Sequence, residues 1–202
     1  MNAATGALHP DWSGGLYPAK VLLPGYEIRP LAIDDASALR DAYARNRDHL
    51  APWEPRRQEQ FFTEAWHHED ARAKVADAAA GRQDPWLIWH GSGQEAEVVG
   101  RVNLSNIARG VFQSANLGYW IDHRHTGRGL ATAAVRAAVR RAADLGLHRL
   151  EAGTLAHNEA SQVVLRRCGF EQFGMAAKYL FIAGAWQDHV MFQKVLHDDP
   201  PS

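Results

Sequence analysis

The chain has 202 residues, 46% of them hydrophobic and 22% charged, with a formal net charge of −1. The length suits one domain with a sizeable core, and the composition excludes general disorder. The near-zero net charge gives no overall basic surface for nucleic acid or an anionic membrane. The single cysteine, Cys168, cannot form an internal disulfide, and residues 1–15 lack the pattern of a secretory signal. We therefore expect a cytoplasmic protein that binds neither nucleic acid nor membrane.

The domain organisation is simple. Residues 1–24 mix glycine, proline and isolated aromatic residues without any period, and we interpret them as a loose N-terminal arm. The patterned part of the chain covers residues 25–196, and residues 197–202 form a C-terminal tail. No internal repeat or low-complexity segment interrupts the pattern, so a single α/β domain is predicted.

The predicted elements follow one another as strand, two helices, three strands, helix, strand, helix and a final hairpin. The strongest helix signal covers residues 130–145, where apolar residues recur at helical spacing. Its arginines Arg136, Arg140 and Arg141 are expected on the opposite, exposed face. The first helix is expected to be capped by Asp34 or Asp35, and the second ends at Gly81. The predicted strands are residues 26–31, 86–90, 97–104, 117–121, 149–155, 179–182 and 186–195, and the other predicted helices cover residues 61–80 and 160–168.

The segment with the clearest chemical signal is Arg124-His125-Thr126-Gly127-Arg128-Gly129-Leu130-Ala131, between a strand and the long helix. Its two glycines allow a sharp turn, and the helix that follows directs N–H groups and its positive dipole end toward the turn. This combination binds phosphate or pyrophosphate, although glycine-rich turns also occur before helices for structural reasons alone. A dinucleotide site is disfavoured, because Thr132 replaces the third glycine of that fingerprint and too little chain follows.

The same residues match Arg-x-x-Gly-x-Gly and resemble the acyl-coenzyme A (CoA) pyrophosphate loop of the GCN5-related N-acetyltransferase (GNAT) superfamily. Asn158-Glu159-Ala160-Ser161, followed by Gly169-Phe170, matches the second landmark of that superfamily. The resemblance implies an α/β GNAT fold, in which helices flank a mixed central sheet with splayed strands. It also implies acetyl-CoA as co-substrate. The residues it assigns to acetyl-CoA are Ile121, Arg124, Gly127, Arg128, Gly129, Leu130, Ala131, Asn158 and Ser161.

A finer resemblance covers residues 43–193. Asn46-Arg47-x-His49-Leu50-x-Pro52-Trp53-Glu54-Pro55 and Tyr179-Leu180-x-Ile182-x-Gly184-x-Trp186 look like segments of RimJ/RimL-type ribosomal-protein N-terminal acetyltransferases, most closely the RimJ branch. This resemblance implies direct acetyl transfer to the α-amino group of a protein N-terminus, such as that of a ribosomal protein. Two alternatives remain open: an acetyltransferase for a small amine or antibiotic, and a non-catalytic acyl-CoA sensor. The oligomeric state is not predicted.

The resemblance also suggests catalytic roles. Many superfamily members carry a tyrosine seven residues after the landmark asparagine, where this chain has Leu165, whereas the RimJ/RimL branch has a serine three residues after it, here Ser161. We assign Ser161 as the proton donor to the leaving thiolate, with a helix-capping role as its alternative. The residues expected to bind the acceptor are Trp53, Glu54, Asn106, Tyr179 and Trp186.

The general base is less clear. The glutamate expected before Gly174 is replaced by Phe173, which leaves Glu54 and Glu151 as acidic candidates, with Glu54 assigned to the catalytic set. An α-amine has a pKa near 8, so a water relay is an alternative to a dedicated base. Asp188 and His189 are adjacent on a strand and should point to opposite faces, which argues against a joint relay.

No metal site is predicted. The chain has 11 histidines, but His67-His68 and His123-x-His125 have no third ligand at a spacing typical of zinc motifs.

Overall fold

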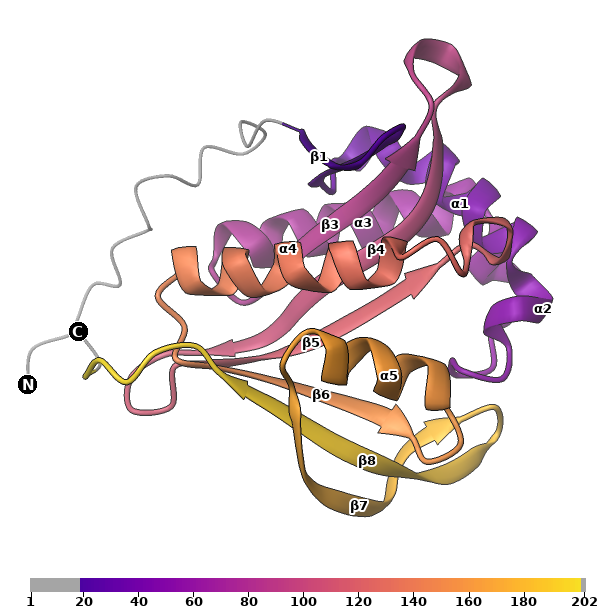
Figure 1. Cartoon of the computed structure of the whole chain (residues 1–202). Coiled ribbons are helices and arrows are strands. Elements are labelled where there is room, and N and C mark those ends of the chain that lie inside the picture. Colours follow the sequence, from indigo (N-terminus) through magenta and orange to yellow (C-terminus); the bar gives the residue numbers. More distant parts are fainter. Residues whose placement is uncertain (1–18, 201–202) are drawn as a thin grey trace, which may run out of the picture.

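Eight strands form one continuous sheet in the computed structural model, which describes residues 19–200 (Figure 1). The strand order is β1-β2-β3-β4-β5-β6-β8-β7, and β5–β6 is the one parallel pair in this described part of the chain. The predicted α/β class with a mixed central sheet is confirmed. The strands are β1 (Lys20–Leu23), β2 (Tyr26–Pro30), β3 (Asp84–His90), β4 (Glu97–Ala108), β5 (Ser114–Ile121), β6 (Arg149–Leu155), β7 (Glu171–Ile182) and β8 (Ala185–Val195).

Helices cover both faces of the sheet (Figure 1). Trp86 and Ile88 of β3 belong to the core under α4, whereas Leu87 between them belongs to the core under α1 and α3. Burial on both faces explains why this strand is an uninterrupted apolar run. The helices are α1 (Ala36–Arg45), α2 (Arg47–Leu50), α3 (Glu64–Ala79), α4 (Leu130–Asp144) and α5 (Glu159–Arg167), with short 3-10 turns η1 (Ile33–Asp35), η2 (Glu59–Phe62), η3 (Gly93–Glu95) and η4 (His123–His125).

The two edge strands of the sheet differ most from the predicted elements. β1 pairs with β2 inside the segment interpreted as a loose arm, so the sheet begins at Lys20 rather than after residue 24. The rest of that arm, residues 1–18, lies outside the described residues. β7 begins at Glu171 rather than at residue 179, and its residues are mostly exposed on both faces. Both are edge strands, and neither shows the alternation that reveals a half-buried strand.

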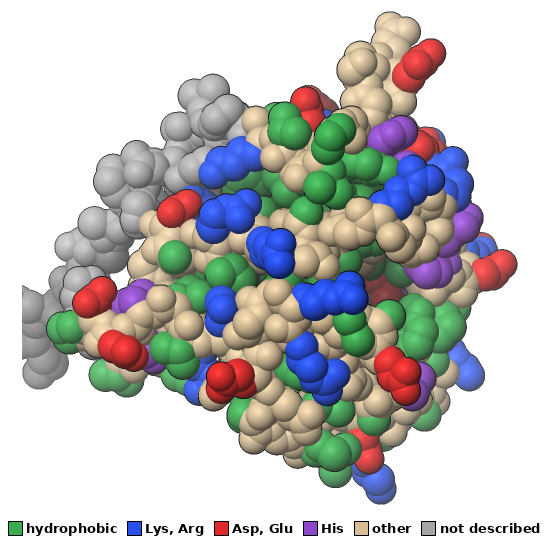
Figure 2. Space-filling model, in the orientation of Figure 1, with side chains coloured by type: hydrophobic (Ala, Val, Ile, Leu, Met, Phe, Trp, Pro, Cys, Tyr) green, Lys and Arg blue, Asp and Glu red, His purple; other side chains and the backbone are tan. Residues whose placement is uncertain are grey.

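The exposed face of α4 carries basic side chains. Figure 2 shows blue side chains gathered over α4 and α5, and Arg136, Arg140, Arg166 and Arg167 are exposed on these two helices. The prediction for Arg136 and Arg140 is therefore confirmed. This local basic band exists although the net charge of the chain is close to zero.

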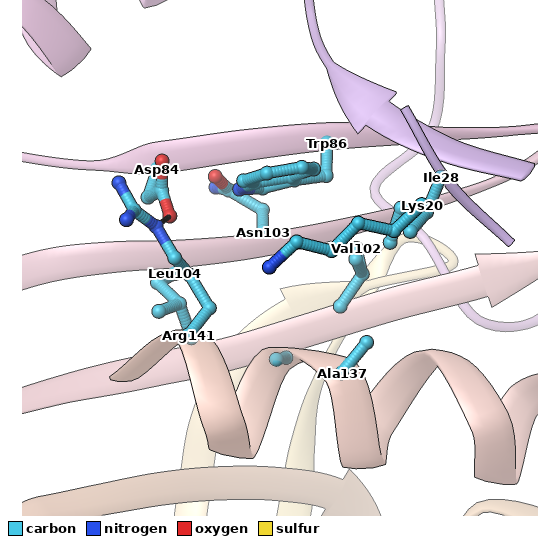
Figure 3. Close-up of a pocket in the computed structure, with 10 residues that line it drawn as sticks. Lys20, Ile28, Asp84, Trp86, Val102, Asn103, Leu104, Ala137 and Arg141 are labelled. Atoms are coloured by element: carbon cyan, nitrogen blue, oxygen red, sulfur yellow. Dashed lines mark hydrogen bonds and ion pairs between the residues drawn. The ribbon is translucent and has the colours of Figure 1, made fainter. Parts of the chain in front are cut away.

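Arg141 departs from the prediction for the same helix. It follows Ala134 and Ala138 on the buried stripe of α4, and its Nε donates to Oδ2 of Asp84 at 2.8 Å, with both side chains buried. Figure 3 shows the pair beside a cavity of about 20 Å³ between α4 and the sheet. A buried charge requires a partner, and β3 supplies it. The sequence pattern of α4 alone does not reveal that partner.

The parallel pair β5–β6 separates along its length. The two strands pair only through Ser114–Asn116 and Arg149–Glu151, within the part of the chain that the structure describes. Beyond this point β5 continues beside β4 and β6 continues beside β8. The carboxyl ends of β5 and β6 therefore diverge, as the resemblance implies, and face the α2 side of the molecule (Figure 1).

Candidate active site

The loop between β5 and α4, which contains Gly127 and Gly129 and is here called the glycine loop, forms one side of the opening between the ends of β5 and β6. Gly127 and Gly129 have φ values of +73° and +77°, which favour glycine, and a β-carbon at either position would meet no protein atom within 4 Å. Gly129 is the N-cap of α4 and has no side chain to bond the first-turn N–H groups. These groups are thus directed out of the helix end, where they can bind an anion.

A buried carboxylate holds this loop in place. Asp122 Oδ2 accepts hydrogen bonds from Arg45 Nε at 2.7 Å and from Asn46 Nδ2 at 2.9 Å, and Oδ1 accepts one from the Arg124 backbone N–H at 2.8 Å. Burial disfavours the charged form, but these hydrogen bonds outweigh it and lower the pKa of Asp122. Asp122 is therefore ionised and joins the end of α1 to the start of the loop.

The other predicted CoA residues of this loop have defined places. Arg124 Nη2 donates to Glu97 Oε2 at 2.7 Å, and Arg128 Nη1 donates to the Tyr26 hydroxyl at 3.3 Å. Leu130 and Ile121 are buried in the core, so they can meet a ligand here chiefly through their backbone. All of these residues lie at the end of the sheet where β5 and β6 diverge.

Ser161 and Asn158 lie on the other side of the opening, at the start of α5. Asn158 Oδ1 accepts a hydrogen bond from the Ser161 backbone N–H at 3.1 Å, so Asn158 is the N-cap of this helix. The Ser161 side chain is not the cap. Its Oγ lies 2.8 Å from the hydroxyl of Tyr119, which reaches across from β5. The pair therefore connects β5 to the first turn of α5, the helix that follows β6.

Sequence reasoning missed Tyr119. Its hydroxyl also donates to the Ser161 carbonyl oxygen at 3.3 Å, and burial raises its pKa to about 12. The hydroxyl therefore stays protonated at neutral pH. The only signal in the sequence was a tyrosine within the strand that precedes the glycine loop, and such a residue reads as an ordinary core aromatic.

The loop after α2, residues 51–58, carries Trp53 and Glu54 and is here called the acceptor loop; it contacts the segment before α5 and the turn between β7 and β8. The Trp53 ring lies 5.5 Å from the ring of His157, next to Asn158. The Glu54 carbonyl oxygen accepts a hydrogen bond from the backbone N–H of Ala183 at 3.0 Å, so the loop is tied to the turn between β7 and β8. Arg56 packs so closely on that turn that a β-carbon at Gly184 would lie 2.4 Å from its guanidinium.

A cavity of about 240 Å³ lies beside this loop. The Glu54 carboxylate is on its wall and pairs with Arg57 at 3.0 Å. Arginines dominate the charged residues of the lining. The lining residues are Tyr43, Arg47, Leu50, Ala51, Glu54, Pro55, Arg56, Arg57, Phe61 and Phe62.

The structure does not bring every predicted acceptor residue to the opening between β5 and β6. Asn106 lies at the irregular end of β4 beside Ser114, where β5 begins, so the whole length of β5 separates it from the glycine loop. Tyr179 contacts His189, with ring centroids 5.4 Å apart, and the exposed Trp186 follows the turn that contacts the acceptor loop. Asn106 is therefore the one of the five predicted acceptor residues that lies apart.

The remaining acid–base candidates have other partners. Glu151 pairs with Arg149 at 2.9 Å near the point where β5 and β6 separate. Phe173 is exposed on β7 and lies under the guanidinium of Arg149 at 5.1 Å. Asp188 accepts a hydrogen bond from the Lys178 N–H, whereas the His189 ring is buried beside Tyr179, so the two do not form a relay.

Comparison with known proteins agrees with this geometry. The family model of the acetyltransferase (GNAT) domain matches residues 26–171. The chain therefore belongs to the GNAT acetyltransferase family. It is 37% identical over 159 residues to the ribosomal protein uS5-alanine N-acetyltransferase of Escherichia coli (strain K12), which covers 78% of this chain and 80% of the relative.

Solved structures lead to the same family. The ribosomal-protein-S5-alanine acetyltransferase of Vibrio fischeri superposes with a TM-score of 0.86 at 32% identity, covering 92% of this chain and 100% of that chain. RimJ of Mycobacterium smegmatis, solved in complex with CoA-disulfide, gives a TM-score of 0.78 at 30% identity, covering 84% of this chain and 81% of that chain. The described part of this chain has no helix that is long and apolar enough to span a membrane.

Proposed function

We propose that this protein transfers the acetyl group of acetyl-CoA to the α-amino group of a protein N-terminus, with a ribosomal protein as the acceptor class. The observation that carries the proposal is the opening between β5 and β6, with the glycine loop on one side and the Ser161–Tyr119 pair across it. The relatives named as uS5-alanine acetyltransferases support the acceptor class. A ribosomal acceptor in turn implies action in the cytoplasm.

The residues divide the chemistry between donor and acceptor. Acetyl-CoA supplies the acetyl group as a thioester, and the acceptor nitrogen forms the new bond to the carbonyl carbon as the carbon–sulfur bond breaks. The first-turn N–H groups of α4 and the loop at Gly127 and Gly129 bind the pyrophosphate. Ser161 gives a proton to the leaving sulfur, and the amine proton leaves to water or to Glu54. The glycine loop leaves room for the phosphate-bearing part of acetyl-CoA, because a β-carbon at Gly127 or Gly129 would meet no protein atom within 4 Å.

The charge of the acceptor cavity favours a peptide over a polycationic amine. Arg47, Arg56 and Arg57 line it, and Glu54 is the one acidic side chain among the lining residues. Such a wall repels an aminoglycoside or a polyamine, whereas a peptide brings a single α-ammonium group that Glu54 can hold. A peptide acetyltransferase and a small-amine acetyltransferase thus predict opposite rankings of acceptors.

An acceptor panel tests this proposal. Peptides with a free α-amine should be acetylated, and the same peptides with a blocked α-amine should be inert. Lysine side chains should react poorly, because an amine with a pKa near 10.4 is seldom neutral at pH 7. Mass spectrometry locates the acetyl group on each product. Efficient acetylation of a small amine, with all peptides inert, would replace the peptide assignment.

Glu54→Gln identifies the acceptor side of the site. We expect this change to raise the peptide KM several-fold and leave acetyl-CoA affinity unchanged, because the glycine loop is on another element. Glu59→Gln is the matched control, since Glu59 is also acidic and also paired with an arginine, Arg47, but does not line the cavity. Equal peptide KM values for the two variants would contradict the role of Glu54.

A further inference from the structure

Three neighbouring strands place a row of side chains next to the loop, residues 91–96, that joins β3 to β4. Tyr26 of β2 lies directly opposite His90 of β3, and His90 lies directly opposite Glu97 of β4. Residues in register on adjacent strands project their side chains to the same face of the sheet. The row therefore presents a phenol, an imidazole and a carboxylate side by side.

His125 comes to this row from the loop that precedes α4. Its ring lies 4.9 Å from the His90 ring, centroid to centroid, and its Nε2 lies 3.8 Å from Glu97 Oε1. The nitrogen and oxygen atoms that His90, Glu97 and His125 can offer to a metal all lie within 4.8 Å of one another. His125 is buried and the other two side chains are half-buried, so part of the group is accessible to solvent.

The spacing of these atoms suits a metal ion. A point central to three atoms no more than 4.8 Å apart lies within about 2.8 Å of each, and small rotations of His90 and Glu97 bring this to the roughly 2.0–2.2 Å of zinc–nitrogen and zinc–oxygen bonds. Two imidazoles and one carboxylate are a ligand set that zinc takes in proteins, with water in the fourth position. The three ligands come from three elements, so their spacing in the sequence resembles no zinc motif.

Neighbouring side chains orient His125 and Glu97 for metal binding. His125 Nδ1 is 2.9 Å from the Tyr26 hydroxyl, and a proton on Nδ1 shared with this oxygen leaves the lone pair of Nε2 free for a metal. Glu97 uses Oε2 for Arg124 and Arg45, at 2.7 and 3.5 Å, so Oε1 faces His125. Asp122 also pairs with both arginines, which limits the positive charge near the ion.

We propose that His90, Glu97 and His125 bind a divalent transition-metal ion of the zinc class. The ion would tie the end of β3 and the start of β4 to the loop that begins at Arg124, and so add a second attachment of the glycine loop beside the contacts of Asp122. The assignment replaces the sequence expectation that the chain lacks a metal site. It does not depend on the identity of the acceptor.

Metal titration of the tag-free full chain tests the site directly. After treatment with a chelator, the protein is titrated with Co²⁺ by visible absorption and with Zn²⁺ by competition against a chromophoric chelator. We expect one equivalent per chain and a Zn²⁺-dependent rise in melting temperature. X-ray absorption at the zinc edge should report two imidazole nitrogens among the ligands. Failure of the wild-type chain to bind a stoichiometric ion would overturn the proposal.

Two variants and a control assign the ligands. His90→Ala should weaken Zn²⁺ binding by about tenfold or more and abolish the melting-temperature rise. His68→Ala is the matched control, because His68 also lies near a glutamate, Glu69 at 3.7 Å, but is exposed on α3. If His90→Ala does not fold, as judged by circular dichroism, Glu97→Gln takes its place. Wild-type affinity in a folded ligand variant would move the ion to other histidines and refute the assignment.

Discussion

The hydrogen bond between Ser161 and Tyr119 is the most informative single contact of the candidate site. A serine hydroxyl is a weak acid, so it delivers a proton well only when a neighbour fixes its orientation or restores its proton. Tyr119 can do both, since it stays protonated at neutral pH and lies 2.8 Å from Ser161 Oγ. Because Asn158 caps α5, the hydroxyl of Ser161 is not needed to hold that helix.

Substitutions of this pair should affect turnover differently. Ser161→Ala should lower kcat by about 10²–10⁴-fold with little change in the KM for acetyl-CoA, as for a lost proton donor. Tyr119→Phe removes both hydrogen bonds of the Tyr119 hydroxyl to Ser161 and should lower kcat by about tenfold, again without a change in KM. Steady-state kinetics and melting temperatures measure both. An unchanged kcat with a lowered melting temperature for Ser161→Ala would make the serine a structural residue.

Residue patterns revealed only the parts of the site that are local in sequence. The glycine loop and the Asn158–Ser161 segment are contiguous, so their spacing was readable. Tyr119 could not be recognised from its sequence neighbours, because its hydroxyl contacts Ser161, which lies 42 residues further along the chain. Asn106 belongs to a segment that looks like the RimJ branch, yet pairing of β4 with β5 places it at the far end of the sheet. Only the pairing register reveals which loops share an end of the sheet.

At the scale of the elements, the sequence pattern predicted α4 correctly but did not reveal the full extent of the edge strands β1 and β7. The helix buries a regular stripe against the sheet, and such a stripe gives a periodic signal. β1 has four residues, and most of β7 is exposed, so neither has the apolar alternation of a half-buried strand. Arg141 was expected to be exposed on α4 but is buried, because it pairs with Asp84, a residue of a different element.

The two ends of α4 provide a matched test of the donor site. Gly129 precedes the helix with φ +77° and Gly146 follows it with φ +69°, and a β-carbon at either would meet no protein atom within 4 Å. Alanine at either position should therefore cost a similar roughly 1–2 kcal/mol of stability from the left-handed backbone. Only Gly129→Ala should weaken acetyl-CoA binding, which calorimetric titration measures. Equal affinities for the two variants would exclude the loop as the pyrophosphate site.

At the scale of the whole molecule, a buried histidine makes the stability of the fold sensitive to pH. His67 of α3 stacks on Tyr43 of α1 with ring centroids 5.3 Å apart, and neither ring nitrogen has a hydrogen-bond partner among the described residues. Burial lowers the pKa of His67 to about 4. The unfolded chain takes up this proton near pH 6.5 and the folded chain resists it, so stability falls as the pH drops from about 6.5 toward 4.

Replacement of this histidine should remove part of the acid sensitivity. The pKa shift corresponds to a loss of about 2 kcal/mol in the free energy of unfolding between pH 7 and pH 5. His67→Leu should abolish this loss, because leucine fills a similar volume and leaves no polar atom unpaired. Urea unfolding at the two pH values measures the difference, with exposed His68→Ala as the control. A His67→Leu chain with the same pH dependence as wild type would contradict the burial argument.

The hydrogen bonds of the buried Asp122 carboxylate make the geometry of the candidate active site depend on the docking of α1. This carboxylate joins Asn46 at the end of α1 to the start of the glycine loop, across 76 positions of the chain, and the Arg45 guanidinium completes the same contact. We expect a contact between such distant positions to form late, because closing a long loop costs chain entropy before any bond compensates it. A nascent or partly folded chain in which α1 is not yet docked therefore lacks a fixed glycine loop. Binding of CoA would then indicate that the chain has completed folding.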